Sequence, residues 1–513
     1  MTLPRDVEAL RDRRAPIEMT GAEFRDAGHG LVDRIAEWLE ALPHGPVTRD
    51  ESPADVRRAV KADRGLPESG TDARQLLGEA AELLFGHSLF NGHPRFFGYI
   101  TSSPAPIGAL ADLLASAVNQ NVGAWRLAPA ATEIEKQTVR WIAELIGFPS
   151  EAGGLLVSGG NMANFVCFVA ARTAKATTKV RSEGLRSLPA QLRVYASIET
   201  HTWIQKAADL FGIGTDAIRW VPTDDQQRMD TSALEDQIAA DTNRGDQPFL
   251  VVGTAGSVGT GVVDPLSDIA AVCRRHDVWF HVDGAYGALA ARVPGAPESL
   301  LGLSEADSVA VDPHKWLYAP VEAGCALVRR PADLLGAFSY HPSYYHFDHE
   351  VMNYFDYGPQ NSRGFRALKV WLALRLVGKT GYLQMIGDDI RLARHLHGLV
   401  QRHQDFEAIA QHLSITTFRY VPHDLRPAQT TPEVEAYLER LNQELLARVE
   451  RSGQAFLSNA VVGGRFALRA CIVNFRTSLA DIEALPPMLS RFGREADGEM
   501  RDLAHLRWGQ TQV

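Results

Sequence analysis

Residues 308–316 read Ser-Val-Ala-Val-Asp-Pro-His-Lys-Trp, a short apolar run that ends in polar and charged side chains. Runs such as Ser308–Val311 are typical of strands that are buried on both faces of a parallel α/β sheet. Ligands of such sheets bind beyond the carboxyl ends of the strands. A lone lysine is usually a surface residue, but one in this position is a candidate Schiff-base former, because desolvation frees its amine. Lys315 is therefore the first candidate catalytic residue.

Four similar runs precede this one, and amphipathic segments of helical length, such as Ser267–His276, lie between them. This alternation predicts an α/β fold with a mostly parallel sheet. We therefore expect the functional residues directly after the runs. The runs are Leu155–Val157, Arg193–Ser197, Phe249–Val252 and Val278–Val282.

Two of the segments that follow these runs carry further candidates. Ser158-Gly-Gly-Asn161 leads into a helix expected over 162–172, where free N–H groups and the helix dipole suit a phosphate, although a plain tight turn explains it equally well. Asp283 follows the run 278–282, and a buried carboxylate there needs a partner. A helix cap or an arginine would serve, and so would a cationic ring nitrogen. A phosphate site, a carboxylate and Lys315 together match the phosphate, the ring nitrogen and the aldehyde of pyridoxal 5′-phosphate (PLP).

Composition argues against several other classes. The chain has 52 Lys and Arg against 62 Asp and Glu, a net charge of −10, so we expect no nucleic-acid partner. No stretch approaches the ~20 apolar residues that span a bilayer, and the start lacks an apolar signal core, so no membrane partner is expected. The four cysteines lack paired spacing, which favours a reduced, cytoplasmic setting. His341, His346 and His349 form only a loose cluster, so no metal is expected.

The pattern of expected helices and strands changes twice along the chain. The first part reads as helices, with a capping box at Thr20 and Glu23, and its limited apolar surface suggests that it clasps a second subunit. Inside it, the charged stretch Asp50–Asp72 is expected to be a connector. The last part reads as helix, short strand and helix, with the clearest strand at Phe466–Asn474. The predicted domains are an N-terminal helical segment (1–92), a large PLP-binding domain (93–390) and a small α+β domain (391–513).

Specific motifs occur across nearly the whole chain, at His93–Tyr99, His281–Tyr286, His314–Leu317, Arg363–Trp371 and Cys471–Arg476. As a set they resemble the group II PLP-dependent amino acid decarboxylases, close to the aromatic-L-amino-acid decarboxylase branch. The resemblance implies an aminotransferase-like (fold type I) large domain and an N-terminal extension that packs across an obligate homodimer. It also implies decarboxylation of an L-amino acid to the corresponding amine and CO2.

The resemblance assigns roles to single residues as well. Lys315 resembles the lysine that binds the PLP aldehyde, and Asp283 the acid that keeps the pyridine nitrogen protonated. His201 resembles the histidine that stacks on the ring, although alone it would read as a capping or surface residue. Asp312 stands where the family often has asparagine, and because an acid is unfavourable beside a phosphate, we expect it to face elsewhere. The other cofactor-binding candidates are Gly160, Asn161 and His314 at the phosphate, Thr254 near the 3′-oxygen and Ala285 beneath the ring.

A catalytic proton donor is expected in the segment 338–347, which on its own could equally be an interface loop. Tyr344 resembles the tyrosine of a mobile loop that protonates the product carbon, with Tyr345 as the alternative. Relatives with phenylalanine at that position tend to be aldehyde synthases. Tyr344 and His201 therefore favour simple decarboxylation, and an aromatic aldehyde synthase is the alternative.

The substrate is expected to be an aromatic L-amino acid such as tyrosine, phenylalanine, tryptophan or Dopa, because the walls of the corresponding pocket mix aromatic and apolar residues. A non-aromatic amino acid is the alternative, and glutamate and aspartate are less favoured because no unmatched arginine stands out for a side-chain carboxylate. The substrate-binding candidates are Tyr99, Ile100, Thr101, Ser102 and Trp125.

Two other classes compete with this interpretation. Aminotransferases and cysteine desulfurases would share Lys315 and Asp283, but they do not predict the His-Lys-Trp surroundings or the N-terminal clasp. A binding protein built on an inactive enzyme fold would have no reason to retain all the expected chemical groups.

Overall fold

The computed structural model describes residues 5–13, 15–176, 180–341 and 351–504. Its centre is a seven-stranded sheet in the order β1-β7-β6-β5-β4-β2-β3. The pairs from β3 to β6 are parallel, and β7 is antiparallel to both of its neighbours. This mostly parallel sheet confirms the predicted fold class. The strands are β1 (Gly153–Val157), β2 (Leu192–Ser197), β3 (Ile218–Val221), β4 (Gln247–Thr254), β5 (Trp279–Asp283), β6 (Ser308–Val311) and β7 (Gly324–Val328).

All five predicted runs form strands, to within a residue or two at their ends. Strands β3 and β7 were not predicted. β3 is a short edge strand whose centre, Arg219 and Trp220, is not buried, so it lacks a continuous apolar run. β7 is buried along its whole length and lies between β1 and β6. Because β7 reverses direction, β1 points the same way as β6, and its carboxyl end reaches the same edge of the sheet.

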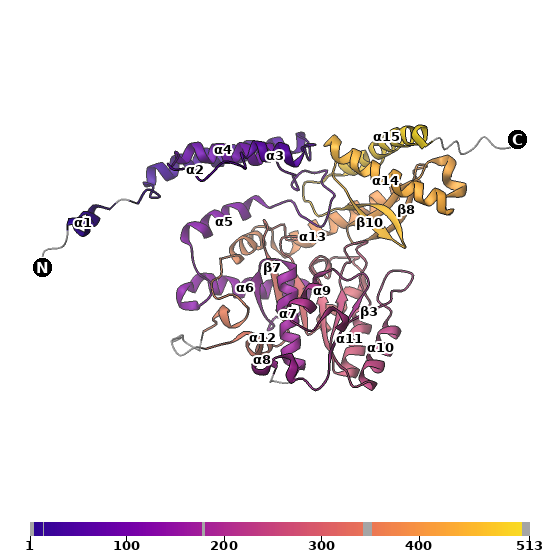
Figure 1. The fold of residues 1–513 in the computed structure, drawn as a ribbon, viewed down its shortest axis with the longest axis horizontal. Helices are drawn as coiled ribbons and strands as arrows, with labels where there is room; N and C mark the ends of the chain where they lie inside the picture. Colours follow the sequence, from indigo (N-terminus) through magenta and orange to yellow (C-terminus); the bar gives the residue numbers. More distant parts are fainter. Residues whose placement is uncertain (1–4, 14, 177–179, 342–350, 505–513) are drawn as a thin grey trace.

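Helices cover both faces of this sheet (Figure 1). Alternate residues of a strand point to opposite faces, so Val251 of β4 joins one apolar cluster while Leu250 and Val252 join the other. The two clusters are the core of the large domain. The helices are α6 (Pro129–Ile146), α7 (Gly160–Lys175), α8 (Val180–Glu183), α9 (Trp203–Leu210), α10 (Thr231–Asn243), α11 (Leu266–His276) and α12 (Pro331–Phe338).

A second, antiparallel sheet of four strands follows the long helix α13 (Ala367–Arg402), which is interrupted at Gly378. Its own apolar cluster includes residues of α14 and α15. The predicted strand at 466–474 corresponds to β11, and the predicted domain boundary at 390/391 falls inside α13, so the division into domains stays a prediction. The elements are β8 (Phe406–His412), β9 (Ile415–Tyr420), α14 (Pro432–Ser452), β10 (Ser458–Val462), β11 (Arg465–Cys471) and α15 (Leu479–Ala504).

The N-terminal helices reach out beyond the large domain (Figure 1). The capping box is confirmed: the Glu23 N–H donates to Thr20 Oγ1 at 3.2 Å, and the Thr20 N–H donates to the Glu23 carboxylate at 2.7 Å. The interpretation of 50–72 as a connector is wrong in part, because Ser52 caps a helix that begins at Pro53, a favoured first residue. These helices are α1 (Arg5–Glu8), α2 (Gly21–Ala41), α3 (Pro53–Ala59) and α4 (Ala73–Gly86). The next helix, α5 (Pro106–Val118), packs against α13.

No helix in the described part of the chain combines the length and the apolar character needed to cross a membrane.

Candidate active site

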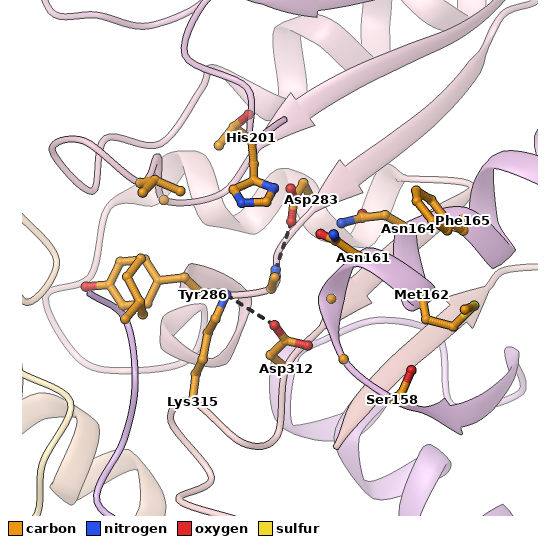
Figure 2. A pocket seen from close by; sticks show the side chains of 17 residues that line it. Ser158, Asn161, Met162, Asn164, Phe165, His201, Asp283, Tyr286, Asp312 and Lys315 are labelled. Atoms are coloured by element: carbon orange, nitrogen blue, oxygen red, sulfur yellow. Dashed lines mark hydrogen bonds and ion pairs between the residues drawn. The ribbon is translucent and has the colours of Figure 1, made fainter. Parts of the chain in front are cut away.

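A cavity of about 400 Å³ opens at the carboxyl edge of the large sheet. Segments that follow five strands, β1, β2, β4, β5 and β6, contribute to its wall, as expected for ligand sites in α/β sheets. Figure 2 shows the side chains of His201, Asp283, Asp312 and Lys315 around one space. Among the predicted cofactor-binding residues, those that line the cavity are Gly160, Asn161, His201, Thr254, Asp283, Ala285 and Lys315.

The turn between β1 and α7 is shaped for an anion. Gly159 has a φ of +132°, a conformation that favours glycine. A Cβ atom at Gly160 would lie 2.7 Å from Asp312 Oδ2, so no larger residue fits there without a shift. The first N–H groups of an α-helix have no partner within the helix and carry the positive end of its dipole. Gly160 and Asn161 begin α7 and line the cavity, so this turn can hold a phosphate.

Asp283 ends β5 and is buried. Its Oδ2 accepts a hydrogen bond from Trp203 Nε1 at 2.8 Å, and its Oδ1 accepts one from the Ala285 N–H at 3.3 Å. Both donors are neutral. Within the described part of the chain no lysine, arginine or histidine forms an ion pair with Asp283. The sequence left open a cap, an arginine partner or a cationic ring nitrogen for Asp283. None of the described arginines is its partner.

Lys315 and Asp312 point toward each other across the cavity wall (Figure 2). Lys315 Nζ lies 3.2 Å from Asp312 Oδ2, and the other carboxylate oxygen, Oδ1, is buried without a hydrogen-bond partner among the described residues. The prediction that Asp312 faces elsewhere is therefore wrong. The local turn explains its direction, because the Asp312 N–H donates to the Ala285 carbonyl and its own carbonyl accepts from the Lys315 N–H. The acid thus lies between the anion-binding turn and the lysine.

His314 does not line the cavity. Its Nδ1 accepts a hydrogen bond from the Ala323 N–H at 3.2 Å, and its Nε2 lies 3.6 Å from Asp312 Oδ2. Burial lowers the pKa of the His314 imidazole. A Cβ atom at Gly159 would lie 3.3 Å from its ring, so His314 supports the turn from behind.

His201 follows β2, lines the cavity and remains exposed to solvent. Its Nδ1 accepts a hydrogen bond from the Trp203 N–H at 3.3 Å, so the neutral ring carries its proton on Nε2. Desolvation by the surrounding protein lowers the pKa of His201. Thr254, at the end of β4, has its hydroxyl 3.5 Å from that of Thr200.

The predicted substrate-binding residues are distributed differently. Ile100 lines the cavity, whereas Tyr99, Thr101, Ser102 and Trp125 lie outside its lining. Ser102 is buried and donates its hydroxyl hydrogen to the His314 carbonyl at 2.7 Å, and Trp125 donates its indole N–H to Glu133 at 3.0 Å. Tyr344 and Tyr345 lie outside the described residues.

Two residues near the site were missed in the sequence. Trp203 lies two residues after His201, and nothing in the local sequence pattern relates it to Asp283. Arg469 of β11 is buried: its Nη1 donates to the Tyr99 carbonyl at 3.1 Å and to Ser458 Oγ at 2.9 Å, while Nε and Nη2 have no partner in the described part of the chain. Arg469 does not line the cavity, so the expectation that no arginine is placed for a side-chain carboxylate stays a prediction. An arginine inside an otherwise apolar strand was the available signal.

The chemistry of these side chains fits PLP. The turn before α7 suits its phosphate, and Lys315 supplies a primary amine at the cavity wall. Asp283, a buried carboxylate with no cationic partner among the residues described, suits its ring nitrogen. The charge of Asp312 is the one unfavourable element, and Lys315 offsets it.

Comparisons with known proteins agree with this chemistry. The family model described as pyridoxal-dependent decarboxylase conserved domain matches residues 53–421. An aromatic-L-amino-acid decarboxylase from Bacillus atrophaeus is 33% identical over 472 residues, covering 91% of this chain and 94% of the relative. A phenylacetaldehyde synthase from a Rosa hybrid cultivar is 28% identical, covering 91% and 93%.

Solved structures of similar proteins share the whole fold. The crystal structure of mouse CSAD is 28% identical with a TM-score of 0.86, covering 92% of this chain and 98% of that one. The crystal structure of Oryza sativa TDC with PLP and tryptamine is 27% identical with a TM-score of 0.86, covering 94% and 99%.

Proposed function

Because this chain belongs to the pyridoxal-dependent decarboxylase family, we propose that it removes the α-carboxylate of an aromatic L-amino acid and releases the amine and CO2. Membership confirms the predicted family, the fold type I architecture, the PLP cofactor and the class of enzyme, an amino acid decarboxylase. The observation that carries the proposal is the convergence of Lys315, Asp283 and the anion-binding turn on one cavity.

Each of these groups has a distinct task in the proposed reaction. When bound, PLP supplies an aldehyde that condenses with amines and a cationic ring that accepts the electrons left behind by CO2. Lys315 would hold the aldehyde carbon until the substrate amine replaces it. Asp283 would keep a proton on the ring nitrogen, and the preorganised N–H groups of Gly160 and Asn161 would hold the phosphate. His201 presents a flat neutral ring to the cavity, suited to lie against the face of the cofactor.

Protonation of the product carbon is the step that separates the two candidate reactions. We infer that Tyr344 delivers this proton. Aldehyde synthesis is the second candidate, supported by the similarity to the phenylacetaldehyde synthase. Exchange of Tyr344 for phenylalanine should shift the product from amine toward aldehyde. An unchanged amine yield would assign the proton to Tyr345 or another donor.

Arg469 supports a further alternative, a decarboxylase for a non-aromatic, acidic amino acid. Its Nη1 donates to the Tyr99 carbonyl, its Nε and Nη2 have no partner among the described residues, and a buried arginine favours a carboxylate. The aromatic substrate is still preferred, because Ile100, Phe165 and Tyr286 contribute apolar and aromatic surface to the cavity.

One experiment tests the proposal directly. The PLP-loaded protein is incubated with single amino acids, and amine, aldehyde and CO2 are measured. We expect equal amounts of amine and CO2 from tyrosine, phenylalanine, tryptophan or Dopa. Borohydride reduction followed by peptide mapping should find the pyridoxyl label on Lys315, and a label elsewhere would refute the assignment.

The assembly and the setting are also part of the proposal. We propose an obligate homodimer in which the segment 1–92 clasps the partner, next to a PLP-binding domain (93–390) and a small C-terminal domain (391–513). Exposed leucines on α5, which lies outside the segment 1–92, support the formation of a dimer. We further propose a reduced, cytoplasmic setting, which the four buried and unpaired cysteines support.

A further inference from the structure

The structure points to Trp203 as a positioning residue of the reaction: we propose that its indole holds Asp283 at the angle the cofactor ring requires while leaving the negative charge of the carboxylate uncompensated. This inference rests on the proposed function, because it assumes that Asp283 faces the ring nitrogen of PLP.

The contacts of Trp203 join the two residues assigned to the ring. Trp203 is completely buried at the start of α9. Its indole Nε1–H donates to Asp283 Oδ2 at 2.8 Å, across 80 residues of sequence, and its backbone N–H donates to His201 Nδ1 at 3.3 Å. The first turn of α9 is therefore a common support for the carboxylate and for the histidine.

The chemistry of the donor decides what this support does. An indole N–H can only donate a hydrogen bond, and it does not titrate. It therefore fixes the position of Asp283 without adding a positive charge, unlike an arginine or a lysine. The second donor to this carboxylate, the Ala285 N–H, is also neutral. The full negative charge of Asp283 is left for the cofactor ring, where it favours a protonated nitrogen.

The chain offers a matched control for simple packing. Trp279 belongs to the same apolar cluster as Trp203 and is equally buried. Its indole N–H also makes one hydrogen bond, to Ser308 Oγ at 2.8 Å. However, Trp279 begins β5 and Asp283 ends it, about 13 Å apart at the rise of a strand. A loss of activity that is common to substitution of either tryptophan has a structural cause. A loss of activity that is specific to substitution of Trp203 indicates the proposed functional role.

The test compares Trp203→Phe with Trp279→Phe in the PLP-loaded enzyme. Loss of a hydrogen bond to a charged group should lower kcat of Trp203→Phe by about tenfold or more, with KM changed less than about twofold. The pH at which the absorbance of the bound cofactor changes should move by about one unit. Trp279→Phe should lower the unfolding midpoint without moving this pH. Equal spectra and pH profiles in the two variants would overturn the proposal.

Two further measurements keep the proposal falsifiable if Trp203→Phe folds poorly. Trp203→His retains a ring N–H and should recover part of the wild-type pH profile; a profile no better than that of Trp203→Phe counts against the role. In a cycle with Asp283→Asn, Trp203→Phe should have no further effect on the PLP dissociation constant, and a full additional effect would refute the coupling.

These results are distinct from a failure of the proposed function. If Lys315 of the wild-type protein takes no pyridoxyl label, the function itself is wrong. If it is labelled while Trp203→Phe behaves like Trp279→Phe, only the role of Trp203 is refuted.

Discussion

Asp283 and Asp312 are two buried carboxylates in one cavity, and their neighbours give them different roles. Among the described residues, the donors to Asp283 are neutral, so its charge is available to a cationic ligand. Asp312 is already paired with the ammonium of Lys315 at 3.2 Å. It also lies against Gly160 in the anion-binding turn. Residue type alone does not separate the two acids, but their partners do.

Exchange of Asp312 for asparagine should tighten PLP binding about tenfold, or ~1.4 kcal/mol. The change removes a negative charge from beside the phosphate and releases Lys315 from its ion pair, and both effects favour the loaded enzyme. The measurement is the dissociation constant of PLP for the variant. Asp388→Asn is the control, because Asp388 forms an exposed ion pair with Arg391 on α13. Weaker binding by Asp312→Asn would mean that this acid helps to hold the cofactor.

At the scale of the elements, a buried ion pair ties the anion-binding turn to distant segments. Arg363 pairs with Glu135 of α6, and both side chains are inaccessible to solvent. Arg363 also donates to the carbonyls of Val122 at 2.9 Å and Leu156 at 2.7 Å. Glu135 accepts from the Leu156 N–H at 2.8 Å, so the pair fixes the end of β1 that leads into the turn.

Exchange of Glu135 for glutamine should therefore lower the free energy of unfolding by about 3–5 kcal/mol, because it leaves a buried arginine without its countercharge. Glu144→Gln on the same helix is the matched control. Its pair with Arg140 is exposed, so its loss should cost less than about 1 kcal/mol. Urea unfolding of both variants measures the difference, and similar costs would argue against a net role for the buried pair.

A second connection between elements joins α13 to the segment after Lys315. Asp389 Oδ2 accepts hydrogen bonds from Trp316 Nε1 at 2.9 Å and from the Tyr318 hydroxyl at 2.8 Å. Burial raises the pKa of Asp389 from 3.8 to about 7. The folded protein thus keeps a proton that the unfolded chain releases. The resulting stability is complete below about pH 4 and is lost as the pH rises through about 7.

Exchange of Asp389 for asparagine should remove this pH dependence and keep an oxygen that accepts both hydrogen bonds. Between pH 5 and pH 7 the wild-type protein should lose about 2 kcal/mol more free energy of unfolding than the variant. Urea unfolding at the two pH values gives the difference, in which the other titrating groups cancel. Parallel losses in both proteins would show that Asp389 does not titrate in this range.

At the scale of the whole molecule, the exposed apolar surface of α5 indicates an interface with a second protein chain. Leu110, Leu113, Leu114 and Val118 recur at helical spacing and are each more than half exposed, while Gly108 and Ala111 are buried. A continuous apolar stripe of this kind marks an interface more often than a free surface.

Exchange of Leu113 for glutamate should therefore turn the proposed dimer into a monomer, because it would bury an unpaired charge in the interface. Leu301→Glu is the control, since Leu301 has the same exposed fraction, 53%, far along the chain in the large domain. Sedimentation velocity of the two variants measures the mass. A dimeric Leu113→Glu protein would place the interface elsewhere.

Much of the site was predictable because its parts are local. Strand length, apolar runs and the residues directly after them follow from short-range pattern, so Lys315, Asp283 and the turn at Gly160 could be placed on one edge of a sheet. Edge strand β3, with partly exposed residues at its centre, carries too weak a pattern for such a prediction.

The sequence by itself thus determined the fold class, the chemical groups and the edge on which they meet. Only the tertiary structure decided how these groups pair: that Asp312 faces Lys315, that Trp203 reaches Asp283, and that Glu135 meets Arg363 across 228 residues. The physical reason is the separation along the sequence of the residues that determine each feature. Secondary structure depends on neighbours in sequence, whereas the partner of a buried charge depends on which side chains long-range packing brings within hydrogen-bonding distance.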